Sequence, residues 1–313
     1  MSNFFDIFVD SAANLTDKMV TDTGINVIPF SYTIDGEQKL CYEKGVPFTN
    51  TAKAFYEKLA GGADIKTSLV CEQDVIEAVT PSLEQGRDVL LITITESLSG
   101  THAQALKAQK TLEEKFPDRK VYVVDSANAS LGEGLLAVNA AKLRDMGENA
   151  ETCAKWVKEN AYRMNSYVTV NELKYLRKSG RVSTITAIAG TILNIKPMLK
   201  ADGNKPAKLS VYAKERGRRK SLEAIAKAFA ENVIGPENQT VAITHCNCEE
   251  DALKLAEMIR ERGARDIVIE YYDLCTGAHV GPGTVALFFM GKDRLVPAAT
   301  EAQSKAKAAT QKF

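Results

Sequence analysis

Residues 92–110 read ITITESLSGTHAQALKAQK. A strand-like run, Val89–Thr95, ends at the polar turn Glu96–Thr101, and the apolar spacing of an amphipathic helix begins immediately afterwards. Units in which a strand leads into a helix build α/β folds. A Ser-Gly-Thr at such a junction offers hydroxyls and the free backbone N–H groups of a helix N-terminus, so we predict that Ser99, Gly100 and Thr101 bind an anion.

The same alternation of strands and helices continues along most of the chain. We predict an α/β protein with mostly parallel sheets, because strands alternating with helices of ten to fifteen residues are typical of βαβ units. The stretch 196–213 differs, since two extended runs flank Asp202-Gly203-Asn204 and predict a hairpin. The expected strands are 5–10, 25–34, 88–95, 120–125, 166–170, 239–245, 266–273 and 284–290. The expected helices are 50–60, 72–85, 101–115, 132–147, 150–162, 183–194, 218–232 and 249–262.

We expect a domain boundary near residues 160–166. It would divide the chain into two α/β domains, 1–163 with the Ser-Gly-Thr anion site and 164–313 with the hairpin and a His-x-Gly-Pro-Gly turn at 279–283. The polar stretch after Gly291 predicts a surface helix or a loosely attached one.

The composition is that of a soluble globular protein. The 313 residues are 45% hydrophobic, and 40 basic residues balance 40 acidic ones, which argues against a broad nucleic-acid surface. No apolar run reaches the ~20 residues of a membrane span, and the first residues lack the basic region of a signal peptide. The six cysteines show no disulfide spacing, so we expect a reducing, cytoplasmic setting.

Further polar residues follow other expected strands. Asp10-Ser11 and Asp125-Ser126 occur in two similar stretches that form a short internal repeat, FDIFVDSAAN and VYVVDSANAS. Carboxyl ends of parallel strands share one sheet edge, so these pairs either join the anion site or simply cap helices. Thr67-Ser68 precede a helix pattern near Glu72 and are either an N-cap or a second pair of hydroxyls for the anion.

We expect no catalytic residue and no metal. The run around Ser99 lacks the first glycine of a Gly-x-Ser-x-Gly elbow, and no nucleotide phosphate loop follows a strand. His245-Cys246-Asn247-Cys248 has no second cysteine pair to complete a zinc site.

Two residues on turns can contact an anion. Arg181 follows Lys178-Ser179-Gly180, which ends a helix carrying Leu173 and Leu176, and it would present a guanidinium fork or a solvated charge. His279 precedes the rigid Gly281–Gly283 turn, which would fix the direction of its imidazole.

Two longer stretches each have two interpretations. The expected helix 183–194 is almost free of charge, so its apolar residues, including Ile185, Ile188 and Ile192, form core or line an apolar cavity. Arg216, Arg218 and Arg219 belong to a basic cluster where a helix dipole disfavours positive charge, so the cluster is a solvated face or meets an acidic partner.

Together these stretches resemble the DegV family, which includes the fatty-acid-binding subunits of bacterial fatty acid kinase. The resemblance covers most of the chain. The motifs that carry it are VDSAANLT at the start, KTS at 66–68, TESLSGTHAQA, VVDSANAS, LKYLRKSGRVS, ILNIKPMLKADG, KERGRRKSLEAI and HVGPG.

The resemblance implies two α/β domains with a long-chain fatty acid between them and no other cofactor. Its acyl chain would be buried, and its carboxylate presented to a separate ATP-binding kinase subunit that makes acyl-phosphate for phospholipid synthesis. Arg181 would lie near the head group or face the partner. The residues that match the family's carboxylate contacts are Thr67, Ser68, Ser99, Gly100, Thr101 and His279.

The sequence departs from the family pattern at two places. Leu69-Val70 follow Thr67-Ser68 where the family often has Gln-Pro, and His102 stands where Tyr is frequent. Two other functions stay open at this point. One is a stand-alone phosphotransferase or acyl-transfer enzyme for a small substrate, and the other is a lipid-responsive regulatory module that docks another protein through the basic cluster.

Overall fold

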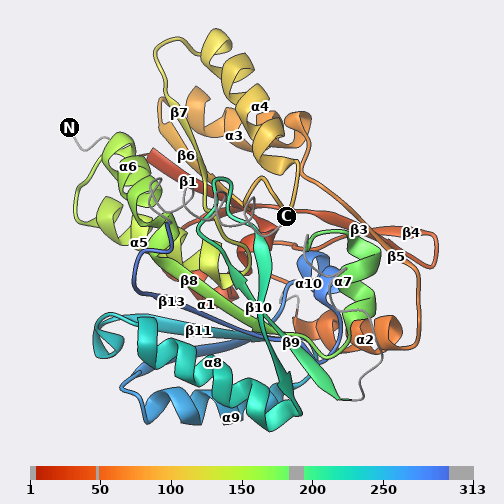
Figure 1. Cartoon of the computed structure of the whole chain (residues 1–313). Helices are drawn as coiled ribbons and strands as arrows, with labels where there is room; N and C mark the ends of the chain where they lie inside the picture. The colour runs from red at the N-terminus through yellow and green to blue at the C-terminus, as the bar shows by residue number, and fades with distance from the viewer. Residues whose placement is uncertain (1–4, 47–48, 183–193, 296–313) are drawn as a thin grey trace, which may run out of the picture.

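A computed structural model describes residues 5–46, 49–182 and 194–295. Its first sheet has four strands in the order β2-β1-β6-β7, and all of its pairs are parallel, as expected. Helices pack on both sides of this sheet (Figure 1). The strands are β1 (Phe5–Asp10), β2 (Asn26–Ile28), β6 (Asp88–Thr93) and β7 (Val121–Asp125). The helices are α1 (Asp17–Thr23), α3 (Glu72–Glu84), α4 (Thr101–Lys115), α5 (Leu131–Asp145) and α6 (Ala150–Asn160).

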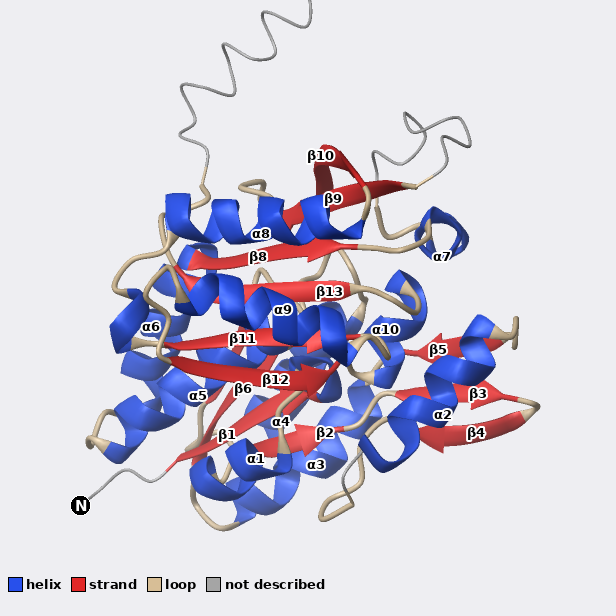
Figure 2. Cartoon of the chain, turned by 90° about the horizontal axis from the view of Figure 1, so that it is seen from below, coloured by secondary structure: helices blue, strands red, loops and turns tan. Residues whose placement is uncertain are grey.

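The second sheet has six strands in the order β10-β9-β8-β13-β11-β12, and only the β11–β12 pair is parallel. The prediction of mostly parallel strands is therefore wrong for this sheet. The alternation of strand and helix patterns along the sequence indicates the type of each element but not the direction of each strand. Helices α8 (Arg218–Asn232) and α9 (Glu249–Arg260) cover one face (Figure 2). The strands are β8 (Met164–Thr169), β9 (Ile195–Ala201), β10 (Leu209–Arg216), β11 (Thr240–His245), β12 (Asp266–Tyr271) and β13 (Val285–Met290).

A small antiparallel sheet, in the order β4-β3-β5, stands beside α2 (Thr49–Ala60). Its strands are β3 (Ser31–Ile34), β4 (Glu37–Leu40) and β5 (Ile65–Ser68). The single strand expected over 25–34 is therefore two strands, β2 and β3, in different sheets. Thr67 and Ser68 lie in β5 and do not cap α3, whose N-cap is Cys71.

Several expected elements are confirmed. The hairpin is formed by β9 and β10, and α7 (Leu173–Ser179) ends at Gly180, whose left-handed backbone caps the helix through an N–H bond to Leu176 O. The short helix α10 (Leu274–Val280) was not expected. The expected helix 183–194, except its last residue, and most of the stretch after Gly291 lie outside the described residues.

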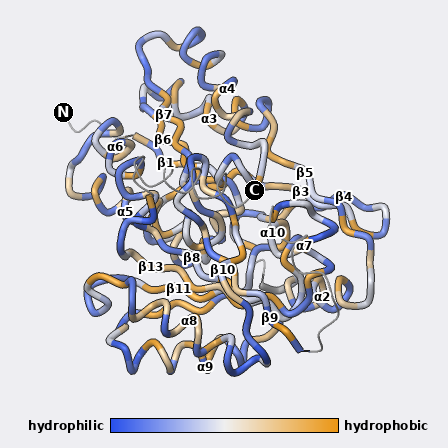
Figure 3. Tube along the Cα trace, viewed as in Figure 1, coloured by the Kyte–Doolittle hydropathy of each residue, from blue (hydrophilic) through white to orange (hydrophobic). Residues whose placement is uncertain are grey.

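Helix α5 lies between the two large sheets. It contacts β1 and β6 of the four-stranded sheet as well as β8, β11 and β13 of the six-stranded sheet. Ten of its residues between Leu131 and Ala141 are buried, as the all-round contact requires. Gly134 allows the close approach, because a Cβ there would collide with the carbonyl oxygen of Ala13. Hydrophobic colours follow central strands such as β6 and β11 (Figure 3).

Asn14 joins the two sheets through its amide. Its Oδ1 accepts hydrogen bonds from the Asp273 N–H at 2.7 Å and from Ser130 Oγ at 3.0 Å, and its Nδ2 donates to Tyr271 O at 2.9 Å. Asn14 adopts the left-handed backbone conformation that Asn tolerates, with φ 58°. The carboxyl ends of β1 and β12 are thereby tied to the start of α5.

The two Asp-Ser pairs organise loops. Asp10 accepts bonds from the Ala12 and Ile94 N–H groups at 3.0 and 2.8 Å, and Asp125 accepts one from Ala127 N at 2.7 Å. The capping interpretation holds for Asp10, which is the N-cap of the short 3-10 helix Ser11–Ala13 and also connects β1 to the loop after β6. Asp125 caps no helix, because the N-cap of α5 is Ser130; its carboxylate instead accepts a further bond from the Glu96 N–H at 3.2 Å, in the turn after β6.

Two residues of the basic cluster have partners within the chain, since Arg219 pairs with Glu223 on the exposed side of α8 and Arg218 is partly buried. Arg218 Nε donates to Asp251 Oδ2 at 2.7 Å, and its Nη2 donates to Gly283 O at 2.8 Å. Asp251 in the first turn of α9 offsets the charge that the α8 dipole disfavours. Arg216 and Arg219 are exposed, so docking through them stays a prediction.

Within the described ranges, no helix combines the length and apolarity needed to cross a membrane. In that same part of the chain, no set of three or more His, Cys, Asp or Glu residues is grouped to hold a metal ion.

A buried carboxyl on α5 gives a test of this architecture. Both Glu133 carboxyl oxygens are buried without a hydrogen-bond partner. Burial raises its pKa well above the usual value, and the charges of Asp10 and Asp273 raise it further. Burial also raises the pKa of Asp10 and of Asp273 to about 7. Because these pKa values are higher in the folded than in the unfolded protein, stability is greatest at acid pH and is lost as the carboxyls ionise.

We therefore expect the free energy of unfolding to fall between pH 5 and pH 8, and to fall less in Glu133→Gln. At pH 8 the variant should be more stable than the unsubstituted protein by about 1 kcal/mol or more, since one pKa unit corresponds to about 1.4 kcal/mol. Urea unfolding at both pH values measures this. The exposed Glu114→Gln is the control, and equal pH slopes in Glu133→Gln and the unsubstituted protein would contradict the assignment.

Candidate functional site

The Ser-Gly-Thr stretch occupies the turn between β6 and α4, as expected. Gly100 is the N-cap of α4, and Thr101 is its first residue. Ser99 Oγ and Thr101 Oγ1 lie 2.9 Å apart, and the Thr101 N–H donates to Ser99 Oγ at 3.3 Å. Ser99 is half-buried and faces a cavity, whereas Thr101 is buried behind it and fixes its hydroxyl.

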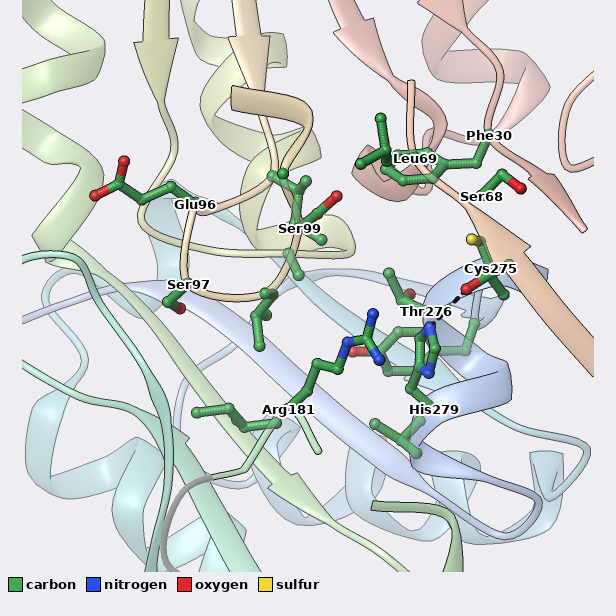
Figure 4. Close-up of a pocket in the computed structure, with 18 of the residues that line it drawn as sticks. Phe30, Ser68, Leu69, Glu96, Ser97, Ser99, Arg181, Cys275, Thr276 and His279 are labelled. Carbon is green, nitrogen blue, oxygen red and sulfur yellow. Dashed lines mark hydrogen bonds between the residues drawn. The ribbon is translucent and has the colours of Figure 1, made fainter. Parts of the chain in front are cut away.

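The cavity beside this turn has a volume of about 360 Å³ and is lined by both halves of the chain (Figure 4). Its polar lining residues include Thr67, Glu96, Ser97, Ser99, Arg181 and His279. The remaining lining is mainly apolar. Its residues include Phe30, Leu69, Ile94, Leu98, Ala129, Leu176, Leu209 and Val280.

His279 and Thr67 form a hydrogen bond across the cavity wall. Thr67 Oγ1 lies 2.9 Å from His279 Nε2, and the His279 tautomer decides which group donates. Burial lowers the pKa of His279 to about 4, and the nearby charge of Arg181 contributes to the decrease. His279 is therefore neutral at pH 7, and the positive charge at this end of the cavity comes from Arg181.

Arg181 comes directly after the glycine that ends α7. Its Nη1 donates to Ser179 O at 2.5 Å, and the guanidinium points toward His279 (Figure 4). Arg181 is exposed, so its fork stands at the border of the cavity and the solvent.

Thr67 and Ser68 lie on opposite faces of β5, because successive side chains of a strand alternate. Thr67 reaches His279, whereas the Ser68 hydroxyl points away from Ser99 and Arg181 (Figure 4). Both residues still line the cavity.

Most residues selected from the sequence meet at this one cavity. Thr67, Ser68, Ser99, Gly100, Arg181 and His279 line it. Ile185, Ile188 and Ile192 lie outside the described residues. His102, where the family often has Tyr, turns away from the cavity and forms a 2.9 Å hydrogen bond with Thr93.

The apolar wall was largely missed by sequence reasoning. Leu98, Ala129, Leu209 and Tyr272 also border a smaller inner chamber of about 40 Å³ next to Phe288. These residues come from four separate segments of the chain. No periodic spacing of apolar residues within one segment could therefore indicate that they form one surface.

The sequence predicts that His279 lies in the glycine turn at 279–283, but the structure places it in the last turn of α10, before that turn. The helix forms because the Asp273 side chain accepts a bond from Thr276 N at 2.8 Å. Tyr56 Oη donates to Tyr272 O at 2.7 Å, and a Cβ at Gly277 would collide with that hydroxyl. Glycine at 277 therefore lets α10 approach α2 and sets the position of His279.

The histidine contacts give no support to a serine hydrolase. His279 bonds to Thr67, His102 bonds to Thr93, and His245 Nδ1 accepts from the Cys248 N–H at 3.4 Å. Since these are the three histidines of the sequence, none forms a described hydrogen bond to a serine hydroxyl.

Gly277→Ala tests the contact that positions His279. We expect it to lower the free energy of unfolding by about 1–3 kcal/mol, the usual range for overpacking. Adding Tyr56→Phe removes the colliding oxygen, so the double variant should lose less stability than the sum of the single variants. Urea unfolding of all four proteins measures the coupling, and strictly additive losses would show that the two residues do not collide.

The comparisons agree with this architecture. Residues 5–292 match the family model described as "Uncharacterised protein, DegV family". A DegV domain-containing protein of Clostridium perfringens is 39% identical over 288 residues, which cover 92% of this chain and 97% of that protein.

Two solved structures share the fold. DegV of Bacillus subtilis, described as a fatty acid binding protein, has a TM-score of 0.76 and 25% identity, with coverage of 92% of this chain and 99% of that one. A Thermotoga maritima protein whose structure is described as revealing a fatty-acid-binding function has a TM-score of 0.76 and 26% identity, covering 91% and 98%. From the family match and the identity to the clostridial protein, we conclude that the chain belongs to the DegV family.

Proposed function

We propose that this protein binds a long-chain fatty acid in the 360 Å³ cavity, with the carboxylate at the polar end and the acyl chain along the apolar wall. The observation that carries the proposal is that one cavity is lined both by hydroxyl, imidazole and guanidinium groups and by a larger set of apolar side chains. Structural relatives that are described as fatty-acid-binding proteins support it. The proposed carboxylate contacts are Thr67, Ser99, Gly100 and His279, with Arg181 beside the head group. Thr101, which is buried behind Ser99, and Ser68, whose hydroxyl points away, would act only indirectly.

The polar and apolar lining residues would contribute differently to binding. Burying methylene groups is worth ~0.8 kcal/mol each, so the acyl chain would supply most of the affinity. Hydroxyls at Thr67 and Ser99 would fix the carboxylate, because a hydrogen bond to a charged group is stronger than one between neutral groups. The apolar route would continue past Ala129 and Leu209 into the inner chamber beside Phe288.

We further propose that the carboxylate is presented to a separate ATP-dependent kinase. A carboxylate oxygen would form a bond to the terminal phosphorus of ATP while the bond from that phosphorus to ADP breaks, giving an acyl-phosphate. This chain would hold the carboxylate in the position that phosphoryl transfer requires, and it would contribute no catalytic residue. The domain division at 163/164 is part of the same proposal, with the ligand between the two domains.

The direct test is lipid extraction from the purified protein, followed by mass spectrometry. We expect a fatty acid at close to one per chain. A protein that carries no lipid and takes up no added fatty acid would contradict the proposal, and turnover of a small substrate without a partner would favour the stand-alone enzyme.

Ser99→Ala tests the carboxylate end. We expect the Kd for hexadecanoate to rise about tenfold, because one hydrogen bond to a charged group is lost. Binding of hexadecanol should change little, since it lacks the carboxylate. Displacement of a fluorescent fatty acid measures both ligands. Equal losses for the two ligands would mean that Ser99 shapes the cavity without contacting the carboxylate.

Ala129→Phe tests the acyl route. The larger side chain would close the passage between the main cavity and the inner chamber, so octadecanoate should lose more affinity than dodecanoate. The same displacement assay across chain lengths measures the difference, and Leu106→Phe on the exposed face of α4 is the control. An equal effect on both chain lengths would place the tail elsewhere.

A further inference from the structure

A second cavity adjoins the fatty-acid cavity. It has a volume of about 470 Å³ and is lined by residues of α2, β5, α7, α10 and the adjoining loops, which lie together in Figure 1. Thr67, Arg181 and His279 line both cavities and form their common wall. A head group held by these three residues is therefore next to the second cavity.

The two cavities differ in charge. All four charged residues that line the second cavity are cations, namely Lys66, Lys174, Lys178 and Arg181. The first cavity has one cation and one anion, Arg181 and Glu96. The neutral state of His279 at pH 7 adds no charge to either side.

Two of the lysines have carboxylate partners outside the cavity lining. Lys174 Nζ lies 2.8 Å from Glu172, and Lys178 Nζ lies 2.7 Å from Asp64. Four cations with two paired carboxylates leave two positive charges in excess. Both pairs are largely exposed, so each holds its lysine only weakly.

We propose that the second cavity binds a phosphate group. An excess of two positive charges matches a phosphate dianion better than a carboxylate, and lysines bind phosphate as point charges. This inference rests on the proposed function, which brings phosphate to the common wall from two sources. One is the acyl-phosphate product, whose tail would stay in the first cavity, and the other is the terminal phosphate of ATP.

The test uses Lys66→Ala/Lys174→Ala in the full-length protein, since both residues are exposed and neither supports the core. Hexadecyl phosphate and hexadecanoate are the probes, and displacement of a fluorescent fatty acid gives each Kd. We expect the double variant to bind hexadecyl phosphate about fivefold more weakly at low salt, the scale of two exposed charge interactions. Hexadecanoate binding should be unchanged, and the difference should shrink at high salt.

The matched control is Lys155→Ala/Lys227→Ala, which removes two exposed, glutamate-paired lysines from α6 and α8. An equal change for both probes, or no change for hexadecyl phosphate, would overturn the proposed phosphate site. Neither result would contradict the proposal that the first cavity binds a fatty acid. If the unsubstituted protein bound no hexadecanoate, the proposed function itself would fail.

A second arm distinguishes the two sources of phosphate. Inorganic phosphate and ATP are titrated into both proteins by calorimetry. If ATP or inorganic phosphate binds and this binding depends on the two lysines, the cavity holds the terminal phosphate of ATP. Lysine dependence confined to hexadecyl phosphate assigns it to phosphate carried by the lipid.

Discussion

The burial of α5 between the two large sheets determines how the rest of the molecule is arranged. The helix contacts strands of both sheets, and Gly134 lets it pack directly against the backbone after β1. Asn14 adds three hydrogen bonds across the same junction. With the sheets fixed in this way, the turn at Ser99 and the helix that carries His279 lie on the two sides of one cavity.

The polar groups of that cavity have fixed positions because each one is held by a neighbour. Thr101 bonds to Ser99, Thr67 bonds to His279, and Arg181 follows a helix cap at Gly180. Gly277 sets the depth of α10 against Tyr56. A head group would therefore enter a site whose donors already stand in place, which reduces the entropy lost on binding.

Much of this was predictable from sequence, because local chemistry marks it. The junction at Ser99, the hairpin and the cap at Gly180 each depend on residues adjacent in the chain. Helix α10 was not predictable, since CTGAH has low helix propensity and its stability comes from the Asp273 cap and from tertiary packing. The antiparallel neighbours of β13 and the internal partner of Arg218 likewise depend on residues far away in the sequence.

The most direct test of the account is a crystal structure of the protein with hexadecanoate. We predict that the carboxylate oxygens lie within hydrogen-bond distance of the Thr67 and Ser99 hydroxyls, with the chain running past Ala129 and Leu209 toward Phe288. A chain lying in the reverse direction, or one bound outside the 360 Å³ cavity, would contradict the central claim.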